Sequence, residues 1–63
     1  SKTTEIFVEG DFVTVVANKW SNGQGCHLMV LNKGQELSLR MAGSFQWSEI
    51  DTILAALTAA RSA

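Results

Sequence analysis

The segment Val15–Leu31, VVANKWSNGQGCHLMVL, places two apolar runs on either side of a short loop rich in Asn and Gly. Apolar, β-branched runs that flank a Gly-containing loop are typical of a β-hairpin. The loop begins with a cation and a large aromatic side chain, Lys19 and Trp20. Two interpretations of Trp20 stay open here: it covers the edge of the sheet, or it is a platform on which an unpaired base stacks.

Strand-like segments occur on both sides of this hairpin. The predicted strands are Glu5–Glu9, Phe12–Ala17, Cys26–Leu31 and Glu36–Met41. In the last strand Ser38 and Arg40 alternate with apolar residues, which predicts a polar face that contains Arg40 and an apolar face formed by Leu37, Leu39 and Met41. A turn signal at Asn32–Gln35 predicts that the last two strands form a hairpin.

The pattern then changes to a helical period. Gly43–Ser44 is predicted to end the last strand, and Ser48–Asp51 resembles a capping box in which Asp replaces the usual Glu or Gln. An apolar stripe follows at helical spacing: Trp47, Ile50, Ile53, Leu54 and Leu57. The predicted fold is therefore α+β, a single domain over 1–63 with a four-stranded antiparallel sheet and one C-terminal helix packed on one face.

The small size of the chain predicts that it assembles into a homodimer. It has 63 residues, and a domain of this size is marginally stable alone. One cysteine excludes an intrachain disulfide, and one Cys with one His cannot supply the four ligands of a structural zinc site. The two central strands are apolar on both faces, which is more surface than one helix covers. We expect the helix stripe to form core and dimer interface.

The charge distribution restricts the class of partner. Five basic and six acidic residues give a net charge of −1, which argues against a duplex binder that relies on many phosphate contacts. Positions 12–48, however, contain only one acid, Glu36, and the three cations Lys19, Lys33 and Arg40. The middle of the chain is therefore net basic, and a dimer would double that charge.

No pattern in the sequence indicates an enzyme, a cofactor or a metal site. Cys26 and His27 are neighbours on a predicted strand, so their side chains should point to opposite faces and cannot form a catalytic pair. No apolar run approaches the roughly 20 residues of a membrane span. The start of the chain has no signal-peptide pattern, and a lone thiol suits a reducing compartment. We therefore expect an intracellular protein, in the cytoplasm or nucleoid of a bacterial host or in a nucleus.

Several short motifs resemble one known family. The strand order, the opening Phe7–Gly10, the Lys19–Trp20 pair before a Gly-containing turn, and Leu37–Leu39 leading to Gln46–Ser48 are similar to the single-stranded-DNA-binding domain of the transcription coactivator positive cofactor four. That superfamily includes the plant Whirly proteins and small bacterial and phage members. The resemblance covers roughly positions 6–60, and the compact chain looks more like a bacterial or tailed-phage member.

The resemblance implies a function and a set of contact residues. Family members dimerise through the C-terminal helices and part of the sheet, and they hold melted DNA in transcription, replication, recombination and repair. Carried over, it implies base stacking by Trp20 and phosphate contacts by Lys19 and Lys33. From its place on the polar side of its strand, we expect Arg40 to meet a phosphate as well. We add Phe12 as a second stacking candidate and His27 as a candidate polar contact. Trp47 matches the structural Trp of the family.

Three departures from the family keep a second hypothesis open. The third strand has no cation over Leu28–Asn32, the segment Leu39–Trp47 is longer than in relatives, and no basic tail is present. The missing strand cation and the missing basic tail predict weaker, more salt-sensitive binding to single strands and little affinity for duplex. The alternative is a protein-interaction module that binds a replication or transcription partner through its exposed sheet.

Overall fold

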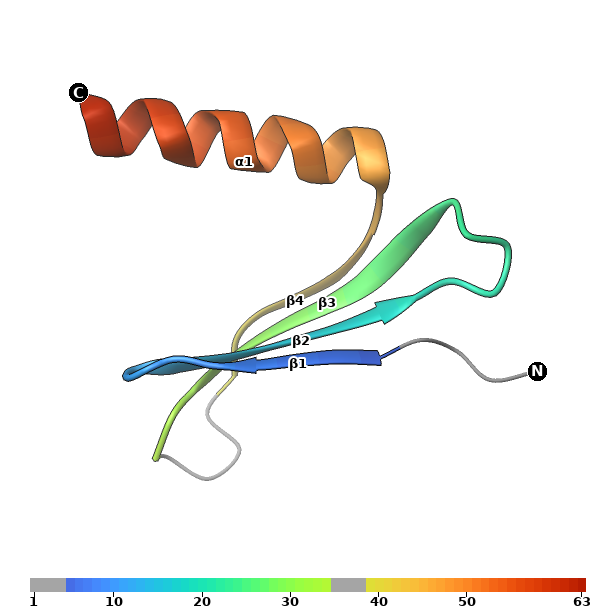
Figure 1. The fold of residues 1–63 in the computed structure, drawn as a ribbon, viewed down its shortest axis with the longest axis horizontal. Helices are drawn as coiled ribbons and strands as arrows, with labels where there is room; N and C mark the ends of the chain where they lie inside the picture. Colours follow the sequence, from blue (N-terminus) through green and yellow to red (C-terminus); the bar gives the residue numbers. More distant parts are fainter. Residues whose placement is uncertain (1–4, 35–38) are drawn as a thin grey trace.

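The computed structural model describes residues 5–34 and 39–63, and within them it has the predicted order of elements (Figure 1). The strands are β1 (Glu5–Glu9), β2 (Val13–Lys19), β3 (Gly25–Asn32) and β4 (Leu39–Gln46), and the helix is α1 (Trp47–Ser62). All neighbouring strands are antiparallel, in the order β1-β2-β3-β4. The predicted α+β fold is confirmed.

The observed bounds of β4 differ from the prediction. The predicted residues Glu36, Leu37 and Ser38 lie outside the described part of the chain, and so does Gln35 of the Asn32–Gln35 turn signal. Lys33 and Gly34 form a turn, and the predicted antiparallel pairing of the last two strands is confirmed. The prediction that Gly43–Ser44 ends the strand is wrong, because β4 pairs with β3 as far as Gln46. The strand continues through the glycine because the Phe45 ring covers it, lying 2.9 Å from the position that a Cβ at Gly43 would occupy.

A β-bulge changes the phase of β4. Met41 pairs with Val30, whereas Leu39 pairs with the next residue of β3, Leu31, which leaves Arg40 as the extra residue. Neighbouring residues of a regular strand point to opposite faces, so Leu39 and Met41 do not share a face. The predicted alternation is therefore wrong at this point, because a bulge adds a residue that the hydrophobic pattern does not reveal.

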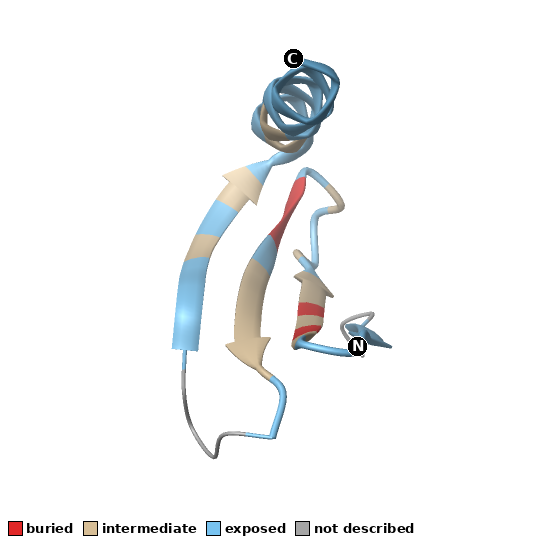
Figure 2. Cartoon of the chain, turned by 90° about the vertical axis from the view of Figure 1, so that its left-hand side faces the viewer, coloured by how far each residue is buried: buried red, intermediate tan, exposed pale blue. Residues whose placement is uncertain are grey.

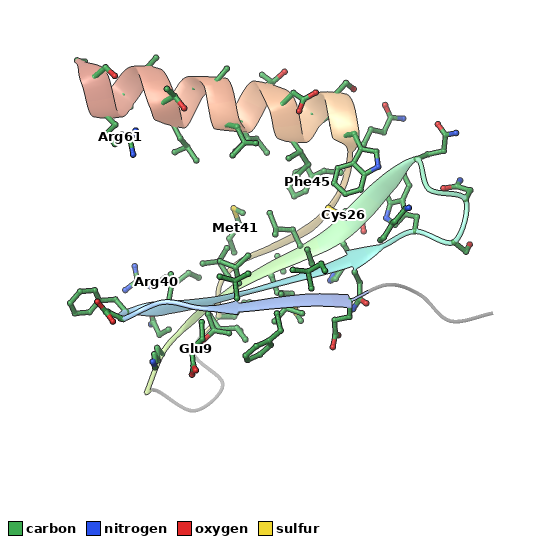
Figure 3. The ribbon with its side chains drawn as sticks, in the orientation of Figure 1. Glu9, Cys26, Arg40, Met41, Phe45 and Arg61 are labelled. Atoms are coloured by element: carbon green, nitrogen blue, oxygen red, sulfur yellow. The ribbon has the colours of Figure 1, made fainter. Side chains whose placement is uncertain are left out.

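The sheet has two distinct faces, which can be followed in Figure 3. Met41 and Phe45 project toward α1, and Glu9 projects the opposite way. Residues paired across strands share a face, so the register defines a helix-side face that includes Ile6, Val8, Val15, Ala17, Cys26, Leu28, Val30, Met41 and Phe45. It also defines a far face that includes Phe7, Val16, His27, Met29 and Ala42. Cys26 and His27 point to opposite faces, as predicted.

Very little of the described chain is buried. The buried side chains are Thr14 and Val16 on the far face of β2 and Cys26 on the helix-side face. Helix α1 has no buried residue, and Leu54 and Leu57 are 56% and 62% exposed (Figure 2). The expectation that α1 packs on one face is wrong for the single chain, since the helix stands away from the sheet beyond the end of β4 (Figure 1).

The N-cap of the helix lies two residues earlier than predicted, at Gln46 instead of Ser48. Glu49 accepts a hydrogen bond from the backbone N–H of Gln46 through Oε1 at 2.8 Å. This bond is half of a capping box with Gln46 at the N-cap and Glu49 three residues later. The predicted pair, Ser48 and Asp51, lies inside the helix, because β4 runs directly into α1 without a loop. Arg61 lies in the last turn, where its charge suits the helix dipole.

Candidate nucleic-acid interface

The β2–β3 loop, residues 20–24, is closed by short hydrogen bonds. The Trp20 N–H donates to the Gly25 carbonyl oxygen at 2.9 Å, and the Gly23 N–H donates to the Trp20 carbonyl oxygen at 2.9 Å. The Gln24 N–H donates to the side-chain oxygen of Asn22, also at 2.9 Å. Gly23 adopts φ +75°, a left-handed conformation that disfavours other residues. The tip of the predicted hairpin is therefore a hydrogen-bonded turn.

The Trp20 ring lies directly on the backbone of Gly25. A Cβ at Gly25 would lie 2.8 Å from a carbon of the Trp20 ring and 2.2 Å from the Phe45 carbonyl oxygen, so only glycine fits. Trp20 is half-buried. Both interpretations of Trp20 are therefore compatible with this geometry. The ring covers the end of the sheet, and part of its surface is still exposed to solvent.

Trp47 ties the start of α1 to the same loop. Its indole Nε1–H donates to the Gly23 carbonyl oxygen at 2.9 Å, and its backbone N–H lies 3.4 Å from the Gln24 carbonyl oxygen. Trp47 remains 42% exposed, so its expected role in a buried core is not met within one chain. The sequence did not reveal this contact, because nothing in the local pattern connects a helix start with a loop 24 residues earlier.

Lys19 lies beside this loop. It is exposed, and it pairs with Cys26 at the end of β2, on the helix-side face. Its Cε atom lies 3.6 Å from the position of a Cβ at Gly23, so the aliphatic stem runs along the loop and leaves the ammonium group in solvent. The structure thus brings Lys19 and Trp20 together at one end of the sheet.

A second aromatic and cation meet at the opposite end. Phe12 is 81% exposed in the β1–β2 turn, and its carbonyl oxygen accepts a hydrogen bond from the Lys33 N–H at 3.0 Å. The Lys33 ammonium lies 3.7 Å from a carboxylate oxygen of Glu9. The length of β2 separates this pair from Lys19 and Trp20, which corresponds to roughly 20 Å of extended chain.

The last two candidate contacts lie on different faces. His27 lies on the far face, where its Nδ1 is 3.1 Å from the Ser44 hydroxyl. Arg40, the bulge residue (Figure 3), donates from Nε to the side-chain oxygen of Asn32. By its register Asn32 lies on the helix-side face. The six predicted contacts therefore do not form one surface on a single chain: they form one pair at each end of the sheet, and His27 and Arg40 stand apart.

His27 belongs to a polar row that crosses the far face. Glu5, Asn18, His27 and Ser44 are successive register partners on the four strands. Asn18 donates to the Glu5 carboxylate at 3.2 Å, and His27 and Ser44 form the second bonded pair. Each polar side chain of the row thus has a hydrogen-bond partner within the sheet. The contact of His27 with Ser44 therefore helps to hold the strands of the far face together.

Comparisons with known protein families, with curated proteins and with solved structures found no match for this chain. Within residues 5–34 and 39–63, no group of three His, Cys, Asp or Glu side chains is placed to hold a metal ion, and no pocket is present. None of the helices described is long and apolar enough to cross a membrane.

Proposed function

We propose that this protein is a homodimeric single-stranded-DNA-binding protein without sequence preference, which acts on melted DNA in replication, recombination or transcription. The observation that carries the proposal is the pair Lys19 and Trp20, held at the end of the sheet by Gly25 and by the bonded loop. An exposed cation beside a half-exposed indole suits one nucleotide, with the base on the ring and the phosphate near the ammonium.

The fixed orientation of Trp20 favours binding. Stacking of a base on an aromatic ring contributes about 1–3 kcal/mol and does not depend on which base is present. One side of the Trp20 ring already lies on Gly25, so little side-chain freedom remains to be lost when a base stacks. The platform would thus be ready before DNA arrives, which suits a protein that binds any unpaired strand.

The second pair extends the surface. Phe12 offers an exposed ring and Lys33 an exposed cation at the far end of β2. A single strand that runs along the sheet could reach both ends, because site sizes for single-strand binders begin at about four nucleotides. Lys33, Arg40 and His27 have less support as contacts than Lys19. Lys33 is paired with Glu9, Arg40 is bonded to Asn32, and His27 to Ser44.

The exposed area supports the dimer. The chain exposes 4997 Å², whereas a folded monomer of 6.8 kDa is expected to expose about 4,000 Å². The excess, about 1,000 Å², is close to the roughly 800 Å² per partner that a specific interface buries. A second copy would cover the stripe of α1, with Ile50, Ile53, Leu54 and Leu57, and the apolar middle of the helix-side face. Lys19, at the end of that face, would stay exposed.

A protein-interaction module is the second candidate function. Glu5 and Glu9 both lie on the far face, and the neighbouring strands contribute no described cation to that face except Lys33, which is paired with Glu9. An acidic, partly apolar sheet face would repel a phosphate backbone and suit a polypeptide. This candidate predicts no affinity for an oligonucleotide at low salt.

The test is binding of a labelled single strand of about 25 nucleotides, several times the smallest site size, beside the same sequence as a duplex at two salt concentrations. We expect binding to the single strand only, weakened by salt. Trp20→Ala should weaken it at both salts equally, and Lys19→Gln should lower the salt slope by about 0.7. Arg61→Gln, which removes an equal charge at the end of α1, should leave the slope unchanged. No binding at low salt would contradict the proposal.

A further inference from the structure

Strand β1 is an exposed edge of the sheet. Among the described residues no strand lies beyond it, and all five of its residues are exposed. Its three central residues are apolar and more than half exposed, at 55% for Ile6, 62% for Phe7 and 57% for Val8. An unpaired, apolar edge of this kind is a template on which another extended segment can pair.

The edge is regular, unlike the edge at β4. All five residues of β1 pair with β2 without a shift of register, from Glu5 with Asn18 to Glu9 with Thr14. At β4 the bulge at Arg40 interrupts the ladder. Bulges disfavour pairing of a further strand. Of the two edges, β1 is therefore the one on which a strand would fit.

The side chains of β1 determine which kind of strand fits. Glu5, Phe7 and Glu9 lie on the far face, and Ile6 and Val8 lie on the helix-side face. A second copy in the fully overlapping antiparallel register would place Glu5 opposite Glu9, and like charges in that position are destabilising. The edge therefore discriminates against its own copy and favours a strand with cations at its two ends.

From this geometry we infer that β1 is a docking edge for an extended peptide with a basic residue on each side of an apolar centre. The peptide would pair antiparallel with β1, with its two cations opposite Glu5 and Glu9 and its central apolar residue beside Phe7. Main-chain hydrogen bonds would provide affinity, and the two carboxylates would provide selectivity. The cations of the peptide would share Glu5 with Asn18 and Glu9 with Lys33, and both of these contacts lie at the exposed surface. The inference does not depend on DNA binding.

The test uses two blocked nine-residue peptides with the cores Lys-Val-Tyr-Val-Lys and Glu-Val-Tyr-Val-Glu. We expect the full chain to bind the basic peptide about tenfold more tightly, because two attractive cross-strand pairs replace two repulsive ones. In the variant Glu5→Lys/Glu9→Lys the preference should reverse. The control, Asp51→Lys/Thr58→Lys, adds positive charge on the helix alone, away from its cap, and should leave the preference for the basic peptide.

The site at which the peptide binds is located by amide hydrogen exchange. The basic peptide should protect amides of β1 and leave those of α1 unchanged. The inference is overturned if neither peptide binds at millimolar concentration, if the preference does not reverse with the charges of β1, or if protection falls elsewhere. Affinity for the single strand, measured on the same variants, separates this result from the proposed function.

Discussion

Trp47 donates its indole N–H to the carbonyl oxygen of Gly23 across 2.9 Å, so the first residue of α1 holds the tip of a loop 24 residues earlier in the chain. We predict that Trp47→Phe removes this bond and destabilises the fold by about 1 kcal/mol, the usual net value of one hydrogen bond. Chemical denaturation measures the change. Amide exchange should also accelerate in the loop, and a variant with unchanged exchange there would show that the bond is dispensable.

Gly25 is predicted to tolerate no side chain. Gly25→Ala would place a methyl group 2.2 Å from the Phe45 carbonyl oxygen and 2.8 Å from the Trp20 ring, so β4 or the ring must shift. We expect a loss of about 1–3 kcal/mol, as for other overpacked sites. Trp fluorescence should shift to longer wavelength as Trp20 leaves the sheet. Ser21→Ala, an exposed change in the same loop, is the control, and equal effects of the two changes would contradict the prediction.

The helix cap gives a direct contrast between two acids. Glu49 accepts the Gln46 N–H at 2.8 Å, whereas Asp51 lies exposed within the helix. We predict that Glu49→Ala costs about 1 kcal/mol, the typical loss for a removed helix cap. Asp51→Ala should change stability by much less. Thermal unfolding of both variants measures this, and a larger effect at Asp51 would favour the cap inferred from sequence.

Stability is predicted to depend on protein concentration. If a second copy covers the helix stripe, a hundredfold rise in concentration should stabilise the folded state by up to about 2.7 kcal/mol. Thermal midpoints across that range provide the measurement. Leu57→Glu, on the stripe, should abolish the dependence, whereas Thr58→Glu should retain it. A concentration-independent midpoint, with a monomer at micromolar concentration in sedimentation, would exclude the dimer.

Local pattern was sufficient to predict the elements. The β-branched residues of β2 and the Gly-containing loop before β3 predicted a hairpin of two strands, and the apolar stripe at helical spacing predicted α1. The sequence also identified Lys19 and Trp20 correctly as neighbours at a hairpin. These features depend on residues close together in the chain, and local propensity therefore determines them.

The pattern failed where distant segments decide the structure. Gly43 stays within β4 because it pairs with Leu28 of β3, and Gly25 must be glycine because the Phe45 carbonyl oxygen and the Trp20 ring both lie against it. The candidate contacts lie at two ends and on two faces of the sheet because of the register between the strands. Composition does not specify that register. Trp47 also remains exposed although the helical spacing places it on the apolar stripe, because α1 stands away from the sheet.

The bulge at Arg40 determines how β4 tolerates changes of residue type and changes of length. Before the bulge the strand presents Leu39 in the phase of Leu31, and after it Met41 and Phe45 face the helix side. A substitution at position 40 would leave this phase intact. Because Arg40 is the extra residue, its deletion would leave Leu39 and Met41 as regular neighbours on their present faces. A deletion within the regular part of β4, at Ala42 for example, would turn over the side chains on one side of it, so single deletions should be tolerated at position 40 and rejected beyond it.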